Sequence, residues 1–162
     1  MIVAIGMDPG PTPGLVRLTY SEQRLISAEV VQCSANAWAR ILHSWLRDSQ
    51  AQRLETYFQG EKFVIGRSSY RSGSPGAVTR DMVGESVQAC AGLAIVTLRS
   101  ASETKSWGTD KRLSMAGLFT PTKGMTHARD AARHALYTAV AEGNIPDPLS
   151  RKARKANAVH GG

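Results

Sequence analysis

The chain lacks several features that would narrow its class at once. Its 162 residues include only two cysteines, Cys33 and Cys90, which are too few for a disulfide framework and do not have the spacing of a metal-binding knuckle. No apolar run is long enough to cross a bilayer, and the N-terminus enters an apolar strand without a basic leader. We therefore expect a cytoplasmic protein without a signal peptide or membrane contact, whose thiols are buried and reduced.

Acidic residues are also scarce. The chain has 13 Asp and Glu residues against 20 Lys and Arg residues, a formal net charge of +7, although its apolar content of 42% is ordinary. This excess favours a polyanionic partner, with nucleic acid as the first candidate, but a basic protein can also carry its charge without one. The length suits one domain, expected over residues 1–145, and a basic tail over residues 146–162 is expected to be flexible.

Hydrophobic patterning predicts strands first and then alternating helices and strands. Strands are expected over residues 2–7, 14–20 and 24–32, the last two forming an antiparallel hairpin. Ser34 is expected to cap a helix over residues 36–48, and a buried strand over residues 62–65 is expected to carry Glu61 at its start. The remaining expected elements are a loop at 66–76, a helix at 77–93, a strand at 94–98, a polar segment at 99–124 and a helix at 126–142. This order predicts an α/β protein with a mixed sheet and helices on its faces.

Three acidic residues stand where a metal site would need them. Asp8 ends the first apolar strand, directly before a Pro-Gly pair, and its charge is costly to bury there unless a cation meets it. Glu61 adjoins a second apolar strand, and Asp130 lies on the last helix, one turn after His127. Carboxylate oxygens suit Mg²⁺, whereas a histidine ligand favours Mn²⁺. Two such ions about 3.5–4 Å apart can activate water and stabilise the charges of phosphodiester hydrolysis.

These segments, taken in order, resemble the RuvC-type Holliday junction resolvases, in particular the phage-encoded branch of the RNase H-like superfamily. The matching pieces are the strand that ends in Asp8, the segment 61–65, the polar stretch 107–113 and the helix with His127 and Asp130. Together they cover about residues 1–142. The resemblance implies an RNase H-like fold with a five-stranded sheet and a nuclease that cleaves Holliday junctions or other branched DNA. It also implies a homodimer, acting in the cytoplasm of the host cell if phage-encoded.

The resemblance further implies that four residues are catalytic and hold two Mg²⁺ or Mn²⁺ ions per site: Asp8, Glu61, His127 and Asp130. Glu55 competes with Glu61 as the second acid, because no smooth apolar run leads into Glu61. His127 is either a metal ligand or a proton shuttle. His134 shares its helix face and is expected to pack in the core or to support a ligand from behind.

Five basic residues are candidates for contact with the DNA backbone: Arg67, Arg71, Lys105, Lys111 and Arg112. The alternative for them is a solvated surface without a partner. A flap or fork nuclease, or a DNA exonuclease, would use the same chemistry, and a domain with a degenerate site would bind DNA without cutting it. Two symmetric cuts in a junction require a dimer, and we expect the apolar faces of the two long helices to supply its interface.

Overall fold

The computed structural model describes residues 1–64 and 72–150. The predicted basic loop therefore falls largely outside the described residues, and so does the predicted tail from residue 151 onward. None of the helices in the described ranges has both the length and the apolar character needed to cross a membrane.

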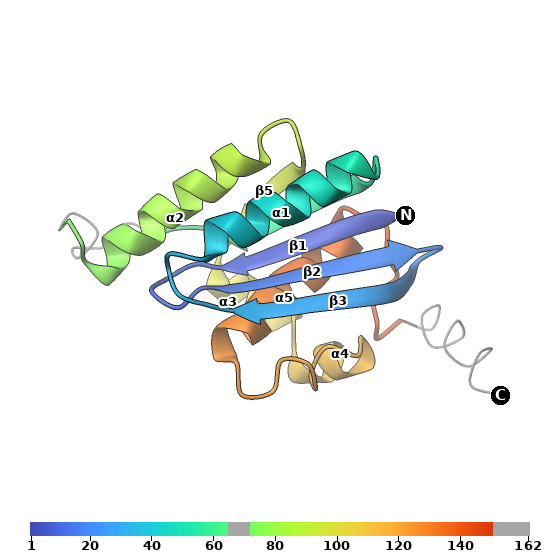
Figure 1. Ribbon diagram of the computed structural model, residues 1–162. Coiled ribbons are helices and arrows are strands. Elements are labelled where there is room, and N and C mark those ends of the chain that lie inside the picture. Colours follow the sequence, from blue (N-terminus) through green and yellow to red (C-terminus); the bar gives the residue numbers. More distant parts are fainter. Residues whose placement is uncertain (65–71, 151–162) are drawn as a thin grey trace.

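Five strands form one mixed sheet in the order β3-β2-β1-β4-β5 (Figure 1). The strands are β1 (Ile2–Asp8), β2 (Gly14–Ser21), β3 (Arg24–Gln32), β4 (Glu55–Glu61) and β5 (Ile95–Arg99). β1, β2 and β3 pair antiparallel, whereas β4 pairs parallel to β1, and β5 pairs parallel to β4. The central strand is thus β1, which has a neighbour on each side and is buried along almost its whole length.

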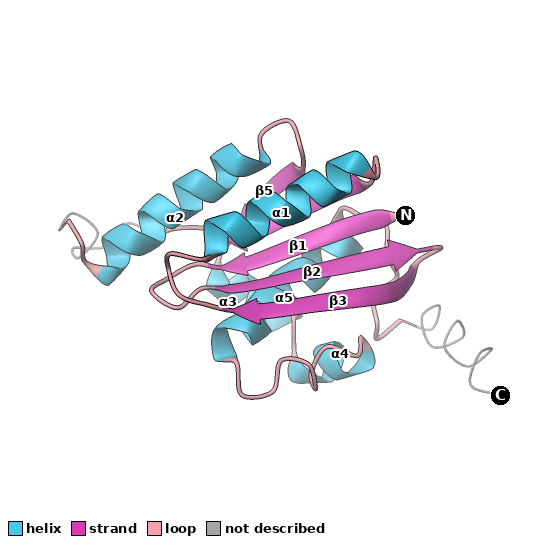
Figure 2. Ribbon diagram, viewed as in Figure 1, coloured by secondary structure: helices cyan, strands magenta, loops and turns pink. Residues whose placement is uncertain are grey.

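Helices cover both faces of this sheet (Figure 2). They are α1 (Trp38–Ala51), α2 (Pro75–Cys90), α3 (Ala101–Trp107), α4 (Asp110–Met115) and α5 (Thr126–Ala141). Strand side chains alternate between faces, so Ile5 and Phe58 pack toward α1 and α2, whereas Ala4 and Leu18 pack toward α5. The predicted α/β class, with a mixed five-stranded sheet and helices on both faces, is confirmed.

The predicted strand over residues 62–65 is wrong for the described part, residues 62–64, which form no strand; residue 65 lies outside the described residues. The strand instead lies earlier in the chain, in β4 (Glu55–Glu61), where Phe58 is fully buried and Glu61 is the last residue. Val64, by contrast, is 74% exposed. Gln59 and the following glycine look like a turn in the sequence, yet Gln59 is completely buried and pairs with the central strand. The error matters for function, because it moves Glu61 from the start of a strand to its end.

Two further predictions about helices need correction. Ser34 does not cap α1, because the N-cap position is Ala37 and no side chain caps the helix there. The Ser34 carbonyl instead accepts a hydrogen bond from the Ala37 amide at 3.0 Å. The segment predicted as merely polar, 99–124, contains α3 and α4. Their caps are the hydroxyls of Ser100 and Thr109, which accept from backbone amides three residues later. A hydroxyl residue followed by an acid in the first turn is a helix-start signal that the sequence already contained.

The apolar faces expected to form a dimer interface are buried inside the domain instead. Met82 and Cys90 of α2 pack in one core, and Ala131 and Leu136 of α5 pack in the other.

The first residues assigned to the tail from the sequence, 146–150, contact the domain. Asp147 binds Arg112 through two oxygens at 3.0 Å each.

Candidate functional site

Asp8 and Glu61 lie side by side at the ends of two adjacent parallel strands. The register that pairs Met7 with Gly60 makes Asp8 and Glu61 the next neighbours, and both side chains belong to the sheet face that α5 covers. Asp8 is only 7% exposed. Glu55 stands at the opposite end of β4, opposite Ile2, where its carboxylate accepts a hydrogen bond from the Tyr57 hydroxyl at 2.6 Å. The structure therefore brings Glu61 to Asp8 and keeps Glu55 away.

Helix α5 brings His127 and Asp130 to the same place, and two glycines permit its close approach. A Cβ on Gly6 would lie 2.0 Å from the backbone oxygen of Ala131, and a Cβ on Gly14 would lie 2.2 Å from the His127 carbonyl. These backbone contacts leave no room for a side chain, so both strands meet the helix directly. The result is a 2.7 Å hydrogen bond between His127 Nδ1 and Asp8 Oδ2.

The start of α5 is held by a side chain that sequence reasoning missed. Gln32, the last residue of β3, accepts through Oε1 from the amides of His127 at 3.0 Å and Ala128 at 3.3 Å. Helix α5 has no side-chain cap from its own N-cap residue. Gln32, 95 positions before His127 in the sequence, does the work of that cap. No local sequence signal identifies such a long-range cap.

Asp130 is neutralised by two cationic side chains. Lys105 Nζ lies 2.9 Å from Asp130 Oδ2, and Arg133 binds the other oxygen. Arg133 also bonds Asp110 at 2.6 Å and the Gly108 carbonyl at 2.7 Å, so it is tightly held, whereas the Lys105 side chain is 55% exposed. The hydrogen bond to Asp130 is the main reason that the pKa of Lys105 lies above its ordinary value.

Asp8 and Glu61, in contrast, carry charge that the protein compensates poorly. Burial raises the pKa of Asp8, although the hydrogen bond from His127 opposes this shift. Burial, together with the neighbouring charge and hydrogen bond of Asp8, raises the pKa of Glu61 to about 7. Two adjacent carboxyl groups of this kind favour either a shared proton or a bound cation.

The donor atoms fit a hard divalent cation at Asp8 and Glu61. In the described ranges, no group of three or more His, Cys, Asp or Glu side chains is placed to enclose a metal ion as the side chains lie here. Both oxygens of Asp130 are bound by Lys105 and Arg133 and are therefore not free for a cation. Displacement of the exposed Lys105 ammonium would free one of them.

The candidate DNA-contact residues have different surroundings. Arg67 and Arg71 lie outside the described residues. Lys105 is at the carboxylate site, and Lys111 is exposed on α4. Arg112 is 15% exposed, stacks over the Trp107 ring and binds Asp147, so its guanidinium holds the domain together rather than facing solvent.

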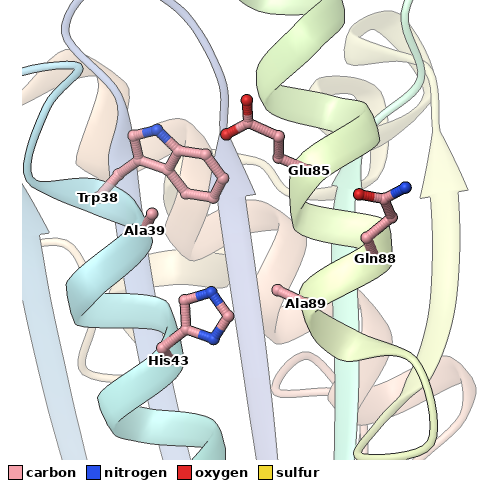
Figure 3. Close-up of a pocket in the computed structure, with 6 residues that line it drawn as sticks. All are labelled: Trp38, Ala39, His43, Glu85, Gln88 and Ala89. Atoms are coloured by element: carbon pink, nitrogen blue, oxygen red, sulfur yellow. The ribbon is translucent and has the colours of Figure 1, made fainter.

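A hollow lies on the face of the sheet opposite the carboxylates, between α1 and α2. It is an open cleft of about 330 Å³ lined by Trp38, Ala39, His43, Glu85, Gln88 and Ala89 (Figure 3). Because α1 and α2 cover the face opposite α5, this cleft is separate from the carboxylates.

No protein-family model and no curated protein sequence matches this chain. Solved structures do match. RuvC from Thermus thermophilus in complex with a Holliday junction substrate has a TM-score of 0.57 and 22% identity, covering 86% of this chain and 93% of that chain. This chain has the RuvC fold. A second Thermus thermophilus RuvC structure gives the same TM-score and identity over 91% of this chain and 100% of that chain.

The RNase H-like fold that the sequence predicts is thereby confirmed. The RuvC fold here presents Asp8 and Glu61 at the ends of β1 and β4, with α5 across them. The expected phage origin gains no support from these neighbours, and the roles of the four site residues stay predictions.

Proposed function

We propose that this protein is a divalent-metal-dependent DNA endonuclease that cuts four-way junctions or other branched DNA. The observation that carries the proposal is the pair of adjacent carboxyl groups, Asp8 and Glu61, whose pKa values are raised where β1 and β4 end. Such a pair is stabilised by a cation of the kind that phosphodiester hydrolysis needs. The RuvC fold, shared with a protein seen bound to a Holliday junction, and the net charge of +7 support branched DNA as the substrate.

Asp8 and Glu61 would hold the cations, and Asp130 would join them when Lys105 moves away. When bound, Mg²⁺ or Mn²⁺ would neutralise charge on the attacking and leaving oxygens of the phosphodiester. An ammonium displaced from Asp130 would still lie beside the site and could bond a non-bridging phosphate oxygen. We propose this second position of Lys105 as its role in the reaction.

His127 is placed to move a proton. Its Nδ1 is bound to the Asp8 carboxylate, so while Asp8 is ionised the imidazole carries its hydrogen on Nδ1 and leaves Nε2 as an acceptor. The side chain is 43% exposed, which gives Nε2 access to water. Orientation of an imidazole by a carboxylate is the usual way to prepare a general base, and we propose that role for His127.

Cleavage of labelled substrates tests the proposal. Four-way junctions, forks, flaps and linear duplex are compared in Mg²⁺ and Mn²⁺, and we expect paired nicks in the junction and little cutting of linear duplex. Asp8→Asn is expected to slow cleavage about 1,000-fold, since loss of metal-assisted charge stabilisation costs several kcal/mol of barrier, while DNA affinity remains. Asp81→Asn, on the exposed side of α2, is the matched control and should cut at the wild-type rate.

One observation favours a second function, a DNA-binding domain that does not cut. Both oxygens of Asp130 are held by cationic side chains, which leaves the site short of a third ligand. Such a protein would bind junctions with a steep dependence on salt, bind no Mn²⁺ in calorimetry and release no product. Cleavage by the wild type, lost in Asp8→Asn, excludes it.

We also propose a homodimer acting in the cytoplasm, because two symmetric cuts need two sites. Analytical ultracentrifugation of the full chain, with and without junction DNA, tests the assembly.

A further inference from the structure

A buried polar pair lies directly beneath the carboxylate site. Gln59 of β4 is 0% exposed, and His134 of α5 is 2% exposed. Gln59 Nε2 lies 3.0 Å from His134 Nδ1, and Gln59 Oε1 accepts from Arg99 Nε at 3.2 Å. Burying an amide and an imidazole in a small domain is costly without hydrogen bonds, and here the two groups bond one another.

The chemistry of Arg99 decides the direction of these hydrogen bonds. A guanidinium only donates, so the Gln59 oxygen must face Arg99 and its amide group must face His134. His134 Nδ1 is therefore an acceptor, and the Thr104 hydroxyl lies 3.5 Å from the same nitrogen. Burial lowers the pKa of His134 to about 4, in agreement with a neutral ring whose hydrogen is on Nε2.

Each member of this network adjoins a residue of the site, either along the sequence or across the sheet. Gln59 precedes Glu61 by two positions in β4, so both side chains face α5. His134 follows Asp130 by four positions in α5, on the same helix face. Thr104 and Arg99 complete the set, since Thr104 adjoins Lys105 in α3 and Arg99 pairs in register with Glu61.

The network thus joins the four elements β4, β5, α3 and α5 one layer below the reacting groups. An apolar pair of similar volume would fill the same space without burying polar atoms, so packing alone does not account for it. Directional bonds restrict how β4 can slide or rotate against α5, and apolar contacts do not. That restriction acts on the distance between Glu61 and Asp130.

We propose that Gln59 and His134 are positioning residues, which set the end of β4 against α5 so that Glu61 and Asp130 can hold one cation cluster. This inference rests on the proposed nuclease function. Neither residue touches the reacting atoms in this scheme. Partners one layer behind metal ligands commonly change metal affinity or activity about 10- to 100-fold when they are removed.

The test uses the full chain and the double variant Gln59→Met/His134→Leu, which removes both members of the buried pair together. Arg99 keeps its bonds to Glu103 and Glu142, and the Thr104 hydroxyl loses only its 3.5 Å contact with His134. Three measurements are made: thermal unfolding, Mn²⁺ binding by calorimetry without DNA, and single-turnover junction cleavage. We expect an unfolding temperature close to wild type, with Mn²⁺ affinity and cleavage rate each lower by about 10- to 100-fold. The single variant His134→Gln keeps Gln59 and offers it an amide oxygen as acceptor, so it should retain most of the wild-type Mn²⁺ affinity and cleavage rate.

Thr138→Val is the matched control. Thr138 is also fully buried on α5, one turn beyond His134, and among the described residues its hydroxyl has no hydrogen-bond partner. It should bind Mn²⁺ and cut as the wild type does. If the double variant does not fold, Gln59→Leu alone decides, because it removes the link from β4 while His134 Nδ1 keeps the Thr104 hydroxyl nearby and Arg99 keeps Glu103 and Glu142.

Wild-type Mn²⁺ affinity and cleavage in the double variant, or in Gln59→Leu where that variant decides, would overturn the inference and leave the network with a packing role. A wild-type protein that neither binds Mn²⁺ nor cuts would instead overturn the proposed function, and this inference with it. The two failures are therefore distinguishable from the wild-type data alone.

Discussion

Replacing Glu61 by glutamine should stabilise the metal-free protein at alkaline pH and destabilise it, relative to wild type, in Mg²⁺. Folding raises the pKa of Glu61 from 4.5 to about 7, mainly through burial and then through the charge of Asp8. An acid with a raised pKa favours the folded state only while it stays protonated. Its contribution is present below pH 4.5 and is lost as the pH rises through about 7.

The magnitude follows from the size of that shift. At about 1.4 kcal/mol per pKa unit the full shift corresponds to about 3 kcal/mol. Because the Glu61 carboxyl is half-buried, solvent screening reduces this to about 1–2 kcal/mol. For a domain of this size, that difference raises the unfolding temperature of Glu61→Gln by about 3–6 °C over wild type at pH 8 without metal. At pH 5, where Glu61 is mostly protonated, the two proteins should unfold at nearly the same temperature.

Differential scanning calorimetry measures both conditions, with a chelator or with Mg²⁺. Metal bound at 100 times its dissociation constant stabilises the wild type by about 2.7 kcal/mol, so the order of the two proteins should reverse in Mg²⁺. Glu85→Gln, exposed on α2 across the sheet, is the control and should show neither effect. An unfolding temperature of Glu61→Gln at or below wild type at pH 8 without metal would refute the argument.

Three other outcomes are expected. Gly6→Ala should destabilise the protein by about 1–3 kcal/mol in urea unfolding, because its Cβ would meet the α5 backbone at 2.0 Å. The control is Gly84→Ala in the open interior of α2, which should stabilise the protein by about 1 kcal/mol. Similar effects at both sites would count against the tight β1–α5 contact. Lys105→Met should slow single-turnover cleavage about 100-fold without lowering the unfolding temperature, and a wild-type rate would remove Lys105 from the mechanism. Deleting residues 151–162 removes four Lys and Arg residues. The slope of log DNA affinity against log salt concentration should then fall in magnitude by up to about 3.6. An unchanged slope would show that these cations do not contact phosphates.

Periodicity and apolar content were enough to predict β1, β2, β3 and α5 closely. Their signals are local, because a buried strand or an amphipathic helix repeats at its own period. The prediction failed at β4, where Gln59 looks like a turn residue and is in fact buried. Its burial depends on Arg99 and His134, which lie 40 and 75 positions away in the sequence. Local patterning cannot anticipate a polar residue whose partners are that distant.

The sequence by itself determined that an acid ends the first strand and that a His-x-x-Asp pair opens the last helix. Only the tertiary structure showed that Glu61 lies beside Asp8 and Glu55 does not, because the parallel register of β1 and β4 puts one glutamate at each end of β4. It also revealed that Lys105 and Arg133 hold Asp130 and that Gln32 caps α5 from the edge strand. Residue type and period are properties of a segment, whereas the charges that meet in a site depend on register and helix approach, which arise only when the segments pack.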